Sequence, residues 1–218
     1  SGDATTTGVR NTAVGHQSFS TNSTGDYNTA LGRDALFGNT TADSNTGVGY
    51  GSLYTNAEGT ANVAVGYNAL DANTVSNNTA VGYDSLGSNT TGTGNTAVGK
   101  DAGEFATTAD LVGSSAGASL TTGSKNDAVG TGALAADDLG SRSVAIGDSA
   151  LGTQNYASAT DSYNTAVGNN AGLYVLTATG STFIGGLAGQ GITGTKLTGV
   201  NNTAVGSSAG LLLQGTAS

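Results

Sequence analysis

The sequence contains no cysteine, proline, methionine or tryptophan, and only 10% of its 218 residues are charged. Without cysteine there can be no disulfide and no thiol chemistry, and cysteine usage gives no indication of the redox compartment. The missing proline, with a glycine pattern that is not Gly-X-Y, excludes collagen. No run of about 18 apolar residues occurs, so we expect no membrane insertion.

Positive charge is also scarce. Six Lys and Arg residues stand against fifteen Asp and Glu residues, which gives a net charge of -9. Proteins that bind nucleic acid need a basic surface, so we expect no nucleic-acid partner. The chain begins at Ser1 without a methionine, from which we expect a processed product or an excised segment.

A short repeat fills the sequence. The motif Asn-Thr-Ala-Val-Gly stands at 11–15 and returns at 78–82, 95–99, 164–168 and 202–206, with close variants in between. Twelve units align on the glycine that closes the motif, and most steps between these glycines are 17 residues. The closing glycines are Gly15, Gly32, Gly49, Gly66, Gly82, Gly99, Gly113, Gly130, Gly147, Gly168, Gly185 and Gly206. A short fixed period is typical of a solenoid, and longer steps predict loops at 152–163 and 190–201.

The coils are predicted to be β. Each motif is too short for a helix and ends in a glycine, while Gly, Thr, Ser and Asn outnumber helix-forming residues. The sequence has no Asn-Gly pair, the commonest tight-hairpin turn, so each strand is expected to pair in parallel with the strand of the preceding coil. We therefore predict an all-β, parallel β-solenoid of about twelve coils, forming a single repeat domain over residues 1–218.

In stacked coils, equivalent residues lie above one another and share one environment. The residue before each closing glycine is always aliphatic, and we predict that this ladder is the dry core. Its members are Val14, Leu31, Val48, Val65, Val81, Val98, Val112, Val129, Ile146, Val167, Ile184 and Val205. On this interpretation Val98→Asp would bury an unpaired charge and destabilise the coil strongly. The uniformly small ladder beside it, which begins at Ala13, fits either a tight turn or the close approach of another backbone.

The repeats resemble a known family. The segment Ser-Val-Ala-Ile-Gly-Asp-Ser-Ala-Leu at 143–151 resembles the repeat in the heads of trimeric autotransporter adhesins. Two further segments, at 63–70 and 78–86, look like related repeats in bacteriophage tail fibres. The resemblance covers nearly the whole chain and implies a left-handed parallel β-roll, three chains side by side, and a role in attachment or as a shaft. It transfers no catalytic residues.

The sequence gives no sign of a catalytic centre, cofactor or metal site, and we expect a protein that is not an enzyme. His16 is the only histidine, and its neighbourhood does not have the spacing of a catalytic triad. Asp137 and Asp138 form the only adjacent acidic pair, which we interpret as a solvated corner. Neutralising both carboxylates is therefore expected to leave the protein unchanged.

The position after the closing glycine suggests a binding edge. In the first six units it is His16, Arg33, Tyr50, Tyr67, Tyr83 and Lys100. We expect Tyr50, Tyr67 and Tyr83 to line one outer edge with their aromatic faces on show, as a candidate edge for glycans or a partner. The alternative is that these rings only cover the edge of the coil.

Three functions fit the sequence. The leading one is a structural rod in an extracellular, cell-surface or virion fibre. We expect it to self-associate, either as a homotrimer or end to end as a filament, with the apolar segment 211–213 covering a neighbouring chain. The second is a carbohydrate-binding adhesin or receptor-binding head that uses the tyrosine edge. The third is an ice-binding solenoid, because Thr12, Thr29, Thr46, Thr79 and Thr96 form a row, although Val63, Asp127 and Phe183 interrupt it.

Overall fold

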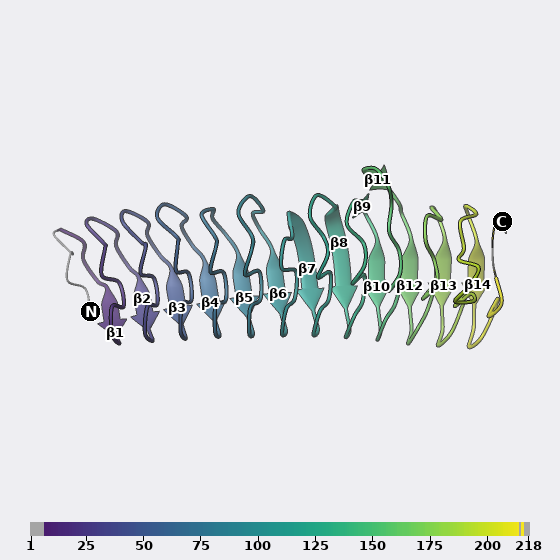
Figure 1. Cartoon of the computed structure of the whole chain (residues 1–218), viewed down its shortest axis with the longest axis horizontal. Coiled ribbons are helices and arrows are strands. Elements are labelled where there is room, and N and C mark those ends of the chain that lie inside the picture. Colours follow the sequence, from purple (N-terminus) through teal and green to yellow (C-terminus); the bar gives the residue numbers. More distant parts are fainter. Residues whose placement is uncertain (1–6, 214, 216–218) are drawn as a thin grey trace. The chain divides into compact units, whose positions relative to one another are not determined.

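The computed structural model describes residues 7–213 and 215, and in this part of the chain all regular structure is β. The chain divides into two compact units, Ser1–Phe105 (unit 1) and Ala106–Ser218 (unit 2). Each unit is a parallel β-solenoid in which every coil contributes one short strand to a sheet (Figure 1). The predicted all-β parallel solenoid of about twelve coils is therefore confirmed. The prediction of one domain over 1–218 stays a prediction.

Unit 1 holds six strands, one in each coil. They are β1 (Thr12–Val14), β2 (Thr29–Leu31), β3 (Thr46–Val48), β4 (Val63–Val65), β5 (Thr79–Val81) and β6 (Thr96–Val98). Neighbours pair in parallel with equivalent residues in register, as Ala30 pairs with Gly47 and Leu31 with Val48. The repeat thus sets the register, because each motif lies beside the next copy of itself.

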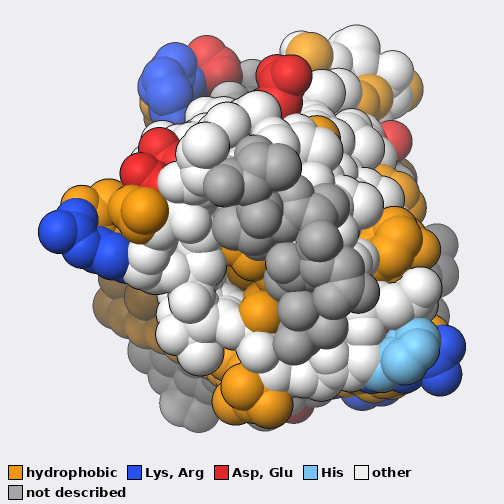
Figure 2. Space-filling model, turned by 90° about the vertical axis from the view of Figure 1, so that its left-hand side faces the viewer, with side chains coloured by type: hydrophobic (Ala, Val, Ile, Leu, Met, Phe, Trp, Pro, Cys, Tyr) orange, Lys and Arg blue, Asp and Glu red, His pale blue; other side chains and the backbone are white. Residues whose placement is uncertain are grey.

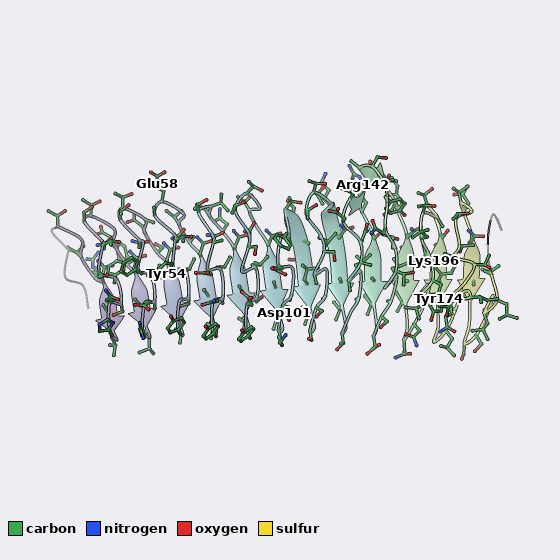
Figure 3. All side chains as sticks on the ribbon, in the orientation of Figure 1. Tyr54, Glu58, Asp101, Arg142, Tyr174 and Lys196 are labelled. Atoms are coloured by element: carbon green, nitrogen blue, oxygen red, sulfur yellow. The ribbon has the colours of Figure 1, made fainter. Side chains whose placement is uncertain are left out.

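Unit 2 repeats this arrangement with two longer strands and a side sheet. Its main sheet runs β7 (Thr108–Val112), β8 (Ser124–Val129), β10 (Val144–Ile146), β12 (Thr165–Val167), β13 (Thr182–Ile184) and β14 (Thr203–Val205). The short strands β9 (Gly140–Ser141) and β11 (Thr160–Asp161) pair separately, and Arg142 lies beside them (Figure 3). Strand β11 lies in the predicted loop 152–163, and an antiparallel bridge joins Ile192 and Thr195 in the loop 190–201.

The interior of each coil is built from the middle residue of the strand, not from the aliphatic ladder. Ala30, Ala64, Ala80 and Ala97 are fully buried. In seven coils, a large side chain four residues after the closing glycine is buried as well, whereas Gly103, Gly117, Gly172, Gly189 and Gly210 stand there in the other five. The large side chains are Phe19, Leu36, Leu53, Leu70 and Leu86 in unit 1, and Leu134 and Leu151 in unit 2.

The predicted core ladder is therefore wrong, because its members point outward. Ten of the twelve are exposed, by fractions that run from 37% at Val65, Val81 and Val98 to 63% at Val205. Val14, Leu31, Val112, Val129, Ile146 and Ile184 are also exposed, while Val48 and Val167 are half-buried. Successive residues of a strand point to opposite faces, so a three-residue strand places two residues on one face and one on the other. In coils such as that of β5, one leucine and one alanine fill the interior, which leaves no room for the valine.

Asparagine supplies most of the buried polar contacts. In unit 1, the asparagine before each strand from β2 to β6 is buried and bonds to a neighbouring coil. The backbone N–H of Asn45 donates to Asn28 Oδ1 at 2.9 Å, and Asn28 Nδ2 donates to the Ala42 carbonyl at 2.8 Å. The same geometry repeats at Asn62 and Asn78, where the backbone bonds are both 2.9 Å. Each amide thus satisfies backbone groups at a corner where no strand partner exists.

A second buried column, of Asn22, Asn39, Asn56, Asn73 and Asn89, lies beside the first in unit 1, and Asn78 Nδ2 of the first column donates to Asn73 Oδ1 at 3.1 Å. Gly25 N–H donates to Asn22 Oδ1 at 3.1 Å, and Asn39 Nδ2 donates to the same oxygen at 3.1 Å. Asparagine is favoured here because one side chain offers both a donor and an acceptor. The two columns together satisfy the buried backbone groups at this edge of the small apolar interior.

The closing glycine is required by the close approach of the next coil. At Gly66, φ is +146°, and a Cβ would lie 2.1 Å from the carbonyl oxygen of Gly82 in the next coil. No other residue fits without moving the backbone of two coils. This explains why glycine recurs at the end of every motif.

Two coils of unit 2 fill their interior differently. Strand β7 carries Leu111 and strand β13 carries Phe183 where the other strands of this unit carry alanine, and both are fully buried. The residues that would collide with them are glycines: a Cβ at Gly189 would lie 2.1 Å from Phe183 Cδ1, and one at Gly117 would lie 2.8 Å from Leu111 Cδ2. In these two coils a larger side chain in the strand replaces alanine, and glycine in the turn replaces the leucine of coils such as that of β10. The two changes in volume offset each other.

Candidate functional site

The outer face of each sheet carries two parallel rows of side chains. One is the aliphatic row described above. The other consists of the first residue of each strand: in unit 1 it is Thr12, Thr29, Thr46, Val63, Thr79 and Thr96. All twelve positions of unit 1 are uncharged, and all are exposed or half-buried. In unit 2 the threonine row continues at Thr165, Thr182 and Thr203, and Phe183 is not an interruption, because it points inward.

This outer face is unusually apolar for a protein surface. Neighbouring strands of a sheet lie about 4.8 Å apart, so the aliphatic side chains of a unit form one continuous stripe. Figure 2 looks at the end of the molecule that carries β1, where hydrophobic side chains reach the surface at several separate places; the stripe itself follows from the exposed fractions of its members. Contiguous apolar patches of this kind mark interaction surfaces in soluble proteins.

The structure brings Tyr50, Tyr67 and Tyr83 together in one stack. The ring centroids are 5.0 Å apart for Tyr50 and Tyr67 and 5.1 Å apart for Tyr67 and Tyr83, with nearly parallel planes. Arg33 lies 5.7 Å from the centroid of Tyr50, and Lys100 lies 5.6 Å from that of Tyr83, so a cation covers each end. The expectation of a row one coil apart on an outer edge is confirmed.

The expectation that these rings show their faces is wrong. Each of the three rings is covered on one side by another ring and on the other side by a ring or a cation. Only ring edges and hydroxyl groups reach solvent, although the side chains are 42–50% exposed. The physical reason is that identical residues one coil apart stack on each other, and stacked rings and cation contacts are each worth about 0.5–1 kcal/mol.

A second aromatic pair lies nearby in unit 1. Phe37 and Tyr54 stack at 5.0 Å with an interplanar angle of 9°. Between this pair and the tyrosine stack is a hollow of about 250 Å³, lined by Tyr50, Gly51, Tyr54, Tyr67, Asn68 and Asp71. Sequence reasoning did not identify Tyr54, Asn68 or Asp71. The sequence indicates the hollow at Gly51, because this glycine stands where the neighbouring repeats have side chains, at Asp34 and Asn68.

Asp137 is fully buried, so the interpretation of this residue as part of a solvated corner is wrong. It occupies the turn position that holds buried asparagine in unit 1. Gly140 N–H donates to Asp137 Oδ1 at 3.0 Å, and Gln154 Nε2 donates to Asp137 Oδ2 at 2.6 Å. Gln154 in turn bonds Ser143 Oγ at 3.0 Å and accepts from Asn164 Nδ2 at 2.8 Å. Asp138, by contrast, is half-buried.

Burial raises the pKa of Asp137 above its ordinary value of 3.8, although the bonds from Gln154 and Gly140 act in the opposite direction. The folded protein therefore holds this proton at a pH where the unfolded chain has lost it. The contribution of Asp137 to stability is greatest below pH 3.8 and is lost as the pH rises through the pKa of the folded state. Each tenfold difference between the acid dissociation constants of the folded and unfolded states corresponds to about 1.4 kcal/mol of stability.

We expect Asp137→Asn to raise the free energy of unfolding at pH 7, because the buried side chain then carries no charge. An asparagine can repeat the pattern of Asn22, whose oxygen accepts two N–H groups and whose Nδ2 donates to the Gly25 carbonyl at 3.2 Å. Denaturant unfolding measured from pH 3 to pH 8 tests this, with Asp138→Asn as the control. Identical pH profiles for the wild type and Asp137→Asn would contradict the assignment.

No cluster with the composition of a metal site occurs in the described residues: no group of three or more His, Cys, Asp or Glu side chains comes together there. His16 is exposed at the coil edge. In the same described ranges, no helix is long and apolar enough to cross a membrane.

Comparison of the chain with protein-family models, with curated proteins and with solved structures gave no match. The candidate surfaces therefore rest on the geometry of this chain alone. They are the apolar outer face of the sheets, the tyrosine stack, and the hollow beside Tyr54.

Proposed function

We propose that the chain is a structural segment of an extracellular, cell-surface or virion fibre that self-associates through the outer face of its sheets. The observation that carries the proposal is the exposed aliphatic stripe. Val65, Val81 and Val98 lie on consecutive strands and are each 37% exposed. Covering such a stripe removes apolar surface from water at about 25 cal/mol per Å².

The resemblance of the repeats to adhesin heads and tail-fibre repeats supports three chains side by side. In that arrangement each chain turns one face toward the other two, and an uncharged face of β-branched residues suits this role. End-to-end filaments are the other form of self-association. They would use the apolar segment at 211–213, where Leu212 is 67% exposed. Residues 214 and 216–218 of this tail lie outside the described residues.

We expect the variant Val65→Glu with Val81→Glu to dissociate the assembly while the coils remain folded. Both side chains point outward, and they are directly paired across β4 and β5, so two carboxylates would meet at the centre of the interface. Sedimentation of the purified protein at micromolar concentration measures the stoichiometry, and circular dichroism measures the fold. A wild-type species of three chains supports the side-by-side arrangement.

The matched control is Thr74→Glu with Thr90→Glu, which adds the same charge to exposed turn residues of unit 1 outside the strands. This control should sediment as the wild type does. A wild type that is monomeric at micromolar concentration would contradict the proposal, and so would a multimer that survives the two valine substitutions. Removal of residues 211–218 separates the two arrangements, since only the end-to-end form requires them.

The alternative functions receive different support. Glycan binding on the faces of Tyr50, Tyr67 and Tyr83 is not proposed, because those faces are covered. Ice binding would use the outer face, but only one threonine per coil lies there, and Asp110 and Asp127 occupy the threonine row in unit 2. The same face is better suited to another protein surface, because its second row is aliphatic.

A further inference from the structure

The hollow beside Tyr54 exists because one repeat departs from its neighbours. Position two after the closing glycine carries a side chain in the adjacent coils, at Asp34 and Asn68, but is Gly51 in the coil of β3. The next coil also has Asp71 in the column where Phe37 and Tyr54 stack. The missing side chain and the shortened aromatic column together leave the space open.

Tyr54 differs from the tyrosine stack because a ring stacks on only one of its faces. Phe37 covers one face of the ring at 5.0 Å. Among the described residues, no second ring and no cation stacks on the other face. Tyr54 lines the hollow, and its side chain, labelled in Figure 3, is 38% exposed. A ring stacked on one side only is a preformed platform for a flat apolar surface.

The polar groups around this platform are mixed donors and acceptors. Asn68 provides an amide, Asp71 a carboxylate, and Tyr50 and Tyr67 provide phenol hydroxyls at the rim. Within the part of the chain that the structure describes, the side chains of Asn68 and Asp71 form no hydrogen bond with another protein group. A ligand rich in hydroxyl groups, each both donor and acceptor, satisfies this set. An ammonium group would leave the donors of Asn68 unmatched.

The charge around the hollow disfavours an anion. Burial and the nearby carboxylate of Asp84 both raise the pKa of Asp71 above its ordinary value. The nearest basic groups are engaged elsewhere, since Lys100 pairs with Asp101 and Arg33 pairs with Asp34. A neutral ligand therefore fits better than an acidic one.

We propose that this hollow binds a neutral saccharide, with one sugar ring stacked on the face of Tyr54 opposite Phe37 and its hydroxyl groups held by Asn68 and Asp71. The apolar C–H face of a sugar ring matches the aromatic face, while the hydroxyl groups at its edge reach the amide and the carboxylate. Tyr50 and Tyr67 contribute only their edges. The site is complete within unit 1 and does not depend on self-association.

Saturation-transfer NMR tests the proposal directly. The probes are the methyl glycosides of glucose, galactose, mannose and N-acetylglucosamine at millimolar concentration, with methyl glucuronide as the anionic comparison. We expect transfer from the wild type to the ring protons of at least one neutral glycoside, and weaker transfer to the glucuronide. Tyr54→Ala should weaken binding on the order of tenfold, the scale of one aromatic contact.

Gly51→Asn is the second variant, designed to fill the hollow without disturbing the fold. Asn68 occupies the equivalent position with φ 51° and Gly51 has φ 61°, so an asparagine fits this backbone. A Cβ at Gly51 would meet only the movable Asn68 Oδ1, at 2.6 Å. We expect Gly51→Asn to melt as the wild type does and to lose binding, while Tyr83→Phe, outside the hollow, retains it. Absence of transfer from the wild type to every neutral glycoside, or binding that survives both Tyr54→Ala and Gly51→Asn, would overturn the proposal.

Discussion

Ala97→Asp is expected to unfold the coils around β6, whereas Val98→Asp, one residue away, is expected to leave them folded. Ala97 is fully buried, as are Leu86 of the preceding coil and Ala102 of its own coil. An aspartate there buries a charge with no partner, which costs more than about 4 kcal/mol. Val98 is 37% exposed, so its replacement is limited to the lower strand propensity of aspartate, about 1 kcal/mol or less.

Thermal and denaturant unfolding followed by circular dichroism measures both variants. The comparison is made at several protein concentrations, because a loss that acts through self-association shrinks on dilution and a loss from a buried charge does not. If Val98→Asp were as unstable as Ala97→Asp at low protein concentration, the assignment of the valines to the outer face would be wrong. This result would also remove the apolar stripe on which the proposed self-association depends.

Which side chains of each strand point into the coil is the part of the fold that could not be predicted from the sequence. Period and register follow from the repeat alone, because any shift would place unlike residues beside each other. The motif Thr-Ala-Val, however, is compatible with two orientations of the strand, one with alanine inside and one with threonine and valine inside. Because valine is more hydrophobic than alanine, the sequence favoured the second orientation, which is wrong. The decisive information was spread over the coil: the leucine four residues after the closing glycine already fills the interior, and only alanine or glycine fits opposite it.

The candidate sites were predictable to different degrees. The row of Tyr50, Tyr67 and Tyr83 followed from the repeat, since equivalent positions lie one coil apart. Its stacked geometry did not, because it depends on ring orientation and on the cations Arg33 and Lys100 at its ends. The hollow beside Tyr54 arises from departures from the repeat, at Gly51 and Asp71. Interruptions of a pattern mark this site, whereas the pattern itself accounts for the fold.

Phe183→Ala removes a large, fully buried side chain from unit 2. We expect it to lower the free energy of unfolding by about 3–5 kcal/mol, because it leaves a cavity. Gly189→Leu alone is also expected to be destabilising, since even its Cβ would lie 2.1 Å from Phe183 Cδ1. Each change removes one half of a matched pair. Denaturant unfolding of unit 2 measures both losses.

The two changes together should restore stability. The double variant has alanine in the strand and leucine in the turn, the combination found with Ala145 and Leu151 in the same unit. The backbone already suits it, because Leu151 has φ 50° and Gly189 has φ 56°. We expect the double variant to lie within about 1.5 kcal/mol of the wild type, as for a volume-conserving exchange in a core. The coupling energy would then exceed about 3 kcal/mol, the upper end for residues in contact. Additive losses in the double variant would show that strand and turn do not share one packing site, and that the glycines opposite Leu111 and Phe183 have another cause.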